Sequence, residues 1–271
     1  MSIQRVILPV SLAIFLATST QLLSMDRGAQ TIISSGVGYT SIEESELLDF
    51  GLGAMFALDR DGIFAVGVSA GWLNDLGDNE EEGYQLGASI SFFPTDKLQL
   101  SLGFNYVSTE FDTWVSGYTS NGNEFYSSWT AESTAIGGNF DIKYRLISAR
   151  ENISPYLVAG IGVSKPDIED KNGYTLLYAR PGYYFKKTGN KYNSVNNAFV
   201  DYDLSNVLVA QIGAGVDFAL TRNVGLNLYF LVGTSQYDHE VSVYDSTYSI
   251  SDSTVWSLGA SIKWYLGGAR D

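Results

Sequence analysis

The chain has 271 residues, a formal net charge of −14 and no cysteine. Charged residues make up only 17% of it, whereas Tyr (18), Phe (14) and Gly (28) are abundant and Pro (5) is scarce. The low charged content indicates a large surface that does not face water, the acidic balance excludes a nucleic-acid-binding surface, and the residue mix favours strands joined by turns.

The first segment of the chain is typical of an export signal. Arg5 supplies a positive charge, and residues 6–17 form an apolar run that is too short to span a bilayer as a helix. Small residues follow this run, so we expect a signal peptide over residues 1–24 that is cleaved after Ser19 or Ser24. No later segment reaches the roughly 18 unbroken apolar residues of a helical span.

Residues 31–266 show a period of two in hydropathy, which is typical of β-strands. In the clearest run, five apolar residues at alternate positions of 98–106 are interleaved with Gln, Ser, Gly and Asn. Several runs reach the roughly 9–11 residues that a tilted strand needs to cross a bilayer. We expect strands at about residues 31–40, 50–56, 64–72, 84–92, 98–106, 136–144, 157–163, 212–218, 224–232 and 256–266.

Two features distinguish these strands from those of a soluble β-sandwich, which also alternates. Their polar face consists mainly of small uncharged residues, which suit a narrow barrel lumen better than a surface in water. Aromatic residues also stand near the ends of the apolar face, as in the two aromatic girdles of a membrane barrel. The predicted girdle residues are Trp72, Tyr84, Tyr106, Tyr144, Trp256 and Trp264.

The connections between the predicted strands alternate in length. Short links at 59–61, 94–96, 148–152 and 221–223 alternate with longer ones at 41–46, 74–83, 110–131, 165–205 and 238–253. Outer-membrane barrels combine short periplasmic turns with long external loops. We therefore predict an all-β fold, a transmembrane up-and-down antiparallel β-barrel of about ten strands over residues 31–266, with eight strands as the alternative.

The last predicted strand carries the most specific motif, formed by Ser257, Gly259, Ile262 and Trp264. With this motif the sequence resembles the outer-membrane β-barrel superfamily, in particular the OmpA-like and opacity-type small porin-like barrels. The resemblance implies that the barrel-assembly machinery reads this strand and that outer-membrane lipid surrounds the barrel. Family members often end on the aromatic residue, whereas residues 266–271 follow it here.

Charged residues on the polar faces of several strands are the candidate functional residues. Their positions place them in the lumen near the short turns, where they form either a selectivity filter or gate, or an ion-pair network that plugs the barrel. They are Asp59, Asp141, Lys143, Arg145, Asp217 and Lys263.

The single histidine is the only hint of catalysis. His239 follows Asp238 in the last predicted long loop, but a catalytic histidine needs partners held close to it. We therefore expect no enzyme activity. No metal-ligand spacing or phosphate-binding glycine loop appears, so no cofactor is expected.

The resulting prediction is a monomeric outer-membrane barrel with a structural, surface-interaction or narrow-pore role. One alternative is an outer-membrane enzyme, a protease or a lipid-modifying protein. Another is an adhesin-type protein that contacts a host through its long loops, with an external ligand at 110–131 and 165–205. A soluble secreted β-protein is the remaining alternative.

Overall fold

The computed structural model describes residues 31–42, 45–58, 63–76, 82–118, 124–148, 151–178, 185–188, 200–243 and 246–266. All regular structure in these residues is β-strand. No helix in the described part of the chain is long and apolar enough to cross a membrane. The predicted signal peptide, residues 1–24, lies outside the described residues.

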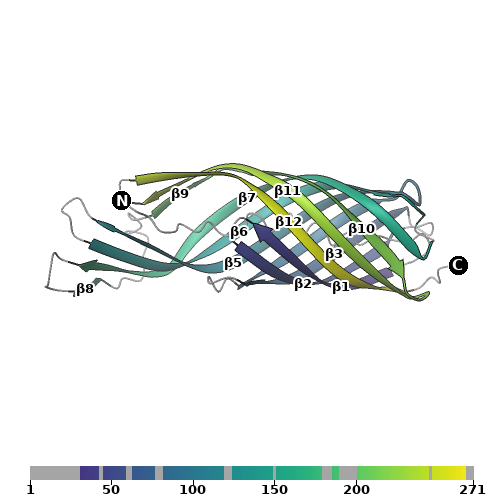
Figure 1. Cartoon of the computed structure of the whole chain (residues 1–271), viewed down its shortest axis with the longest axis horizontal. Coiled ribbons are helices and arrows are strands. Elements are labelled where there is room, and N and C mark those ends of the chain that lie inside the picture. The colour runs from purple at the N-terminus through teal and green to yellow at the C-terminus, as the bar shows by residue number, and fades with distance from the viewer. Residues whose placement is uncertain are drawn as a thin grey trace.

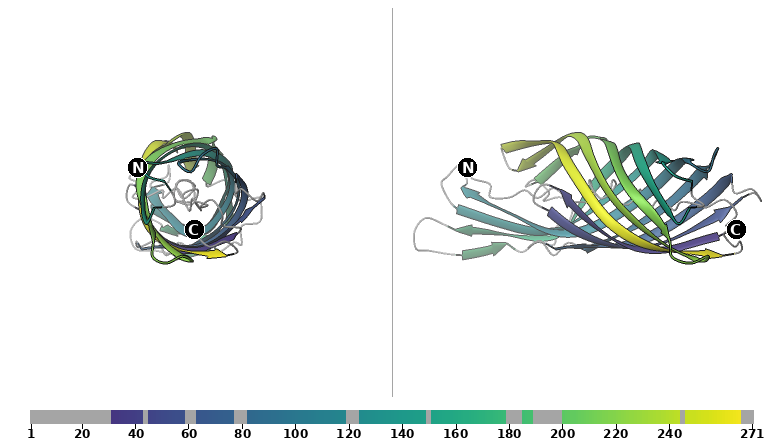
Figure 2. Two further views of the ribbon diagram at one scale, coloured as in Figure 1. Left: turned by 90° about the vertical axis from the view of Figure 1, so that its right-hand side faces the viewer. Right: turned by 45° about the vertical axis from the view of Figure 1, so that its right-hand side comes forward.

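The strands form one antiparallel sheet that closes into a barrel (Figures 1 and 2). Ten strands make up the barrel wall, in the order β1 to β7 and then β10 to β12. β1 pairs with β12 to close the ring, and β7 pairs with β10. The ten are β1 (Thr31–Ile42), β2 (Ser45–Ala57), β3 (Phe64–Asp75), β4 (Glu82–Phe92), β5 (Leu98–Tyr118), β6 (Glu124–Arg145), β7 (Ile153–Tyr178), β10 (Val207–Ala219), β11 (Val224–Val243) and β12 (Ser246–Leu266).

This architecture confirms the predicted all-β barrel of about ten strands, and the alternative of eight strands is wrong. The short segment at the start of the barrel decides the count. β1 pairs with β2 along one edge and with β12 along the other, over residues 31–42 in both cases. The weak alternation of Ile33, Val37 and Tyr39 therefore belongs to a full barrel strand.

The short turns hold the strands at one end of the barrel. Thr95 and Thr221 stabilise two of these turns in the same way, because each hydroxyl accepts hydrogen bonds from the backbone N–H groups two and three residues later. At the opposite end, the strands differ in length. β1 to β4 have 11 to 13 residues, whereas β5, β6, β7, β11 and β12 have 20 to 26.

The prediction of three long loops at this end is therefore wrong. Most of residues 110–131, 165–205 and 238–253 that the structure describes are strand, including the two short strands β8 (Phe185–Thr188) and β9 (Val200–Leu204). These strands project from the barrel as two sheets, one of β5, β6, β7 and β8 and one of β9, β11 and β12 (Figure 1). Hydropathy did not mark them, because alternation requires that the two faces of a strand meet different surroundings.

The barrel wall is apolar outside and more polar inside. Leu52, Ile136 and Ile212 are 64 to 68% exposed on the outer face, which is the pattern of a lipid-facing band. Inside, two apolar clusters occupy part of the lumen. One lies near the short turns and consists of Ile32, Met55, Ala65, Phe93 and Tyr265. The other lies toward the opposite end of the barrel and consists of Leu47, Leu73 and Val107.

Candidate functional site: a charge cluster in the barrel lumen

Four charged side chains from three separate strands meet inside the barrel. Lys143 and Arg145 lie near the end of β6, Asp217 near the end of β10 and Lys263 near the end of β12. Because side chains alternate along a strand, Lys143 and Arg145 face the lumen together while Tyr144 between them faces outward. The antiparallel order places all three strand ends at the end of the barrel with the short turns.

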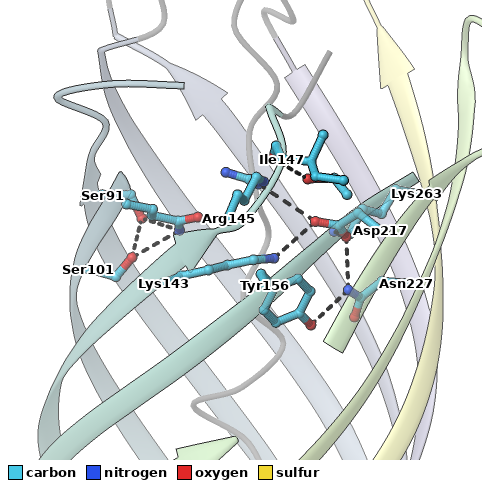
Figure 3. Close-up of polar contacts among 11 residues, drawn as sticks. Ser91, Ser101, Lys143, Arg145, Ile147, Tyr156, Asp217, Asn227 and Lys263 are labelled. Carbon is cyan, nitrogen blue, oxygen red and sulfur yellow. Dashed lines mark hydrogen bonds and ion pairs between the residues drawn. The ribbon is translucent and has the colours of Figure 1, made fainter. Parts of the chain in front are cut away.

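Asp217 is the centre of this cluster (Figure 3). Its Oδ1 accepts a hydrogen bond from Lys263 Nζ at 2.7 Å, and its Oδ2 accepts one from Lys143 Nζ at 3.1 Å. Arg145 Nη2 lies 3.7 Å from Oδ2. The three cationic side chains are at most 2% exposed, so the attraction acts where water screens it little.

Two uncharged residues complete the cluster. Lys143 Nζ lies 3.5 Å from the centre of the Tyr156 ring, in a cation–π contact. Asn227 Nδ2 donates to both the Tyr156 hydroxyl at 2.9 Å and Asp217 Oδ1 at 2.8 Å. Sequence reasoning missed both residues. The signal was present, since Tyr156 alternates with the predicted outward residue Leu157, but alternation gives only the face and not the partner.

Asp141 and Asp59 stand apart from this cluster. Asp141 is buried on β6 and accepts hydrogen bonds from the amides of Gln211 and Asn139. It makes no ion pair with any cation in the described part of the chain. Asp59 lies outside the described residues. The structure therefore brings together Lys143, Arg145, Asp217 and Lys263 and leaves Asp141 in an amide environment.

A neutral hydrogen-bond network lies beside the cluster on the wall formed by β4 and β5. The hydroxyls of Ser91 and Ser101 are 2.8 Å apart, and Gln99 Nε2 donates to Ser101 at 3.0 Å. Figure 3 shows the Lys143 side chain extending from this side of the lumen toward Asp217. The four charged side chains come from β6, β10 and β12, whereas Ile32, Met55 and Ala65 of β1 to β3 belong to the apolar cluster near the short turns. The charges are therefore concentrated on one side of the lumen.

The predicted girdle residues lie on the outer surface. Trp72, Tyr84, Tyr144, Trp256 and Trp264 are 36 to 53% exposed. Tyr106 contacts Tyr84, with ring centres 6.0 Å apart. Sequence reasoning missed Tyr39, whose ring lies 5.3 Å from Trp256 on the neighbouring strand.

The residues of the predicted assembly motif all lie on β12. Ser257 and Gly259 face the lumen, while Ile262 and Trp264 face outward. The Tyr229 side chain lies against Gly259, so closely that a Cβ at this position would overlap the Tyr229 ring and hydroxyl. Gly259 thus provides the space that a lumen-facing tyrosine of β11 occupies.

His239 was predicted to lie in a long loop, but it lies in the projecting part of β11. Its backbone is paired with Ile250 of β12 and Leu204 of β9. Among the described residues, no group of three or more His, Asp or Glu side chains could hold a metal ion.

The barrel is similar to solved outer-membrane barrels. The translocator domain of the autotransporter NalP from Neisseria meningitidis aligns over 93% of both chains with 10% identity and a TM-score of 0.50. The outer-membrane protein OprG from Pseudomonas aeruginosa aligns over 88% of this chain and 96% of its own, with 12% identity and a TM-score of 0.40. The outer-membrane protease OmpT from Escherichia coli aligns over 90% and 99%, with 8% identity and a TM-score of 0.43. No family model and no curated protein matches the sequence. The chain therefore has an outer-membrane β-barrel fold, and this likeness transfers no activity.

Proposed function

We propose that this chain is a surface-contact protein of the outer membrane, in which a filled barrel anchors two projecting sheets that face the outside. The observation that carries the proposal is the length of the strands. β5, β6 and β7 have 21, 22 and 26 residues, whereas a membrane-spanning strand needs about 9–11. The strands are thus about twice as long as the membrane requires.

The extra length is built as regular paired sheet. β5 and β6 pair without a break from Leu98 and Tyr144 to Tyr118 and Glu124. The apolar outer face of β5 ends at Tyr106, so twelve residues lead from there to Tyr118. At the usual strand rise and tilt, this hairpin projects roughly 30 Å beyond the lipid-facing band.

The projecting sheets also present strand edges to which a partner can bind. β5 pairs with β4 only as far as Glu110, and β12 pairs with β1 only as far as Val255. Within the described residues, 111–118 of β5 and 246–254 of β12 therefore pair on one side only. Such edges accept an extended segment of another polypeptide by strand addition, which supports a contact role for the projections.

The lumen favours anchoring over solute passage. Arg145, Lys143, Lys263 and Gln99 are among the largest fully buried side chains of the described residues, and the apolar clusters occupy other parts of the interior. A ten-stranded barrel has a narrow interior that side chains can fill. We therefore expect little or no conductance from the wild-type protein.

The absence of cysteine gives a direct test of the orientation. Ser116→Cys on the projecting part of β5 should react with a membrane-impermeant maleimide on intact cells. The matched variant Arg222→Cys, on a short turn, should react only after the outer membrane is permeabilised. Labelling of Arg222→Cys alone on intact cells would reverse the orientation and refute the proposal.

The contact role is tested by shortening the β5–β6 projection. Replacing residues 111–131 by a short turn should preserve the heat-modifiable gel migration of a folded barrel. The change leaves the pairing of β5 with β6 intact from Leu98 to Glu110. Attachment of the expressing cells to protein-coated surfaces should fall, while conductance in planar bilayers stays near zero. Unchanged attachment together with a large wild-type conductance would favour a pore instead.

A further inference from the structure

Counted over the residues that the structure describes, the charge cluster in the lumen contains more positive than negative charge. Among the described residues, Lys143, Arg145 and Lys263 surround one carboxylate, that of Asp217. Asp141 lies two positions from Lys143 but is hydrogen-bonded to amides and pairs with none of these cations. Buried charges are normally paired, because an uncompensated charge in a low-dielectric interior is costly.

The carboxylate of Asp217 is largely occupied by other donors. Its Oδ1 accepts from Lys263 Nζ at 2.7 Å and from Asn227 Nδ2 at 2.8 Å, and its Oδ2 accepts from Lys143 Nζ at 3.1 Å. The remaining cation, Arg145, stays at 3.7 Å from Oδ2, which is beyond hydrogen-bond distance. Asp217 therefore satisfies the two lysines and does not satisfy the arginine.

The unsatisfied atoms of Arg145 form one particular edge of its guanidinium group. Nε and Nη2 are buried and donate no hydrogen bond to any described residue, although the side chain is only 1% exposed. These two nitrogens carry parallel N–H bonds on the same side of the planar group. This is the edge that grips two oxygens of a phosphate or carboxylate at once.

From this arrangement we infer that the lumen cluster binds a small free oxyanion of the phosphate type, held by the Nε–Nη2 edge of Arg145 with Lys143 as the second cation. Arg145 is the last residue of β6, so this edge lies near the end of the barrel that carries the short turns. The bound anion brings a negative charge to a group of three cations and one carboxylate. This site is independent of the projecting sheets and of their contact role.

The test uses the folded mature chain in a non-ionic detergent that contains no phosphate group. The thermal midpoint of the heat-modifiable gel shift is measured against sodium phosphate, with sodium chloride at equal ionic strength as the reference, and phosphate affinity is measured by calorimetry. A ligand that binds only the folded state raises its stability with concentration. We expect a saturable rise in midpoint with phosphate that chloride does not reproduce.

Two variants separate oxyanion binding from general screening of charge. Arg145→Lys retains the charge but loses the two-pronged edge, so phosphate affinity should fall about tenfold or more. The matched control Arg222→Lys, on an exposed turn at the same end, should bind phosphate like the wild type. The same fall in affinity in both variants, or in neither, would overturn the assignment of the site to Arg145.

A third variant is expected to raise the phosphate affinity rather than lower it. Asp217→Asn removes the internal carboxylate that competes for the cations, so the folded fraction should bind phosphate about tenfold more tightly. A cluster that exists only to hold the strands together predicts lower stability for this variant and no gain in phosphate affinity. A wild-type protein whose midpoint responds equally to phosphate and chloride would refute the site.

Discussion

Replacement of Leu102 by arginine tests the assignment of the outer face to lipid. Leu102 lies on β5, midway between Leu98 and Tyr106 at the two ends of the outward apolar run, and is 48% exposed. Its cross-strand neighbours Ile90 and Phe140 are also exposed and apolar. Each end of the run is four residues away, roughly 10 Å along the membrane normal for a tilted strand.

An arginine at this depth places a cation near the middle of the bilayer. We expect Leu102→Arg to lower the free energy of unfolding by about 2–4 kcal/mol, as measured by a denaturant titration in lipid vesicles. Leu98→Arg is the control for depth, because it puts the same side chain on the same face at the edge of the band. It should cost about 0–1 kcal/mol.

Ser101→Arg is the control for the opposite face. Ser101 is buried in the lumen against Ser91 and Gln99, so an arginine there acts through crowding. Thinner bilayers should therefore reduce the cost of Leu102→Arg and leave that of Ser101→Arg unchanged. Equal costs for Leu102→Arg and Leu98→Arg, or a cost of Ser101→Arg that follows bilayer thickness, would refute the assigned faces.

Three further substitutions test the lumen and the projecting strands. Gly259→Ala should destabilise the barrel by about 1–3 kcal/mol in the same titration, because a methyl group overlaps Tyr229; an unchanged midpoint would mean that Tyr229 is free to repack. Asp217→Ala leaves three cations without their shared carboxylate, so the unfolding free energy should fall by about 3–5 kcal/mol or bilayer conductance should rise. A large wild-type conductance that this change does not alter would contradict a filled lumen. His239→Ala should leave the fold and any biological activity intact, whereas loss of a hydrolytic activity from a folded variant would place an enzyme function first.

The sequence predicts which face of a strand a residue occupies better than it predicts the residue's partner. Alternation on β6 indicates that Asp141, Lys143 and Arg145 all face the lumen, and they do. Their partners are set by the stagger of strands that are distant in the chain, since Lys143 meets Asp217 while Asp141 meets Gln211. No pattern within one strand contains that information.

The same reasoning explains why Tyr156 escaped notice as a site residue. Its position on the lumen side follows from the outward positions of its neighbours on β7. Its role depends on Lys143 of the next strand lying over its ring and on Asn227 of β11 donating to its hydroxyl. The first contact joins two paired strands and the second crosses β10, so neither follows from the alternation within β7 alone.

Strand length was the other property that alternation did not predict. Alternation is visible only where one face meets lipid and the other the lumen, so the signal on β5 ends near Tyr106 although the strand continues to Tyr118. Connection length did carry the missing information: of the five longer links, the two least long, 41–46 and 74–83, flank the short strands, whereas 110–131 becomes a hairpin. Because the links differ in length, β5 and β12 extend beyond their neighbours β4 and β1, and residues 111–118 and 246–254 are paired on one side only.

Changes in these connections therefore alter the outer projections without touching the charge cluster at the opposite end. The two proposed sites, one for a surface partner and one for an oxyanion, can consequently be tested independently of each other.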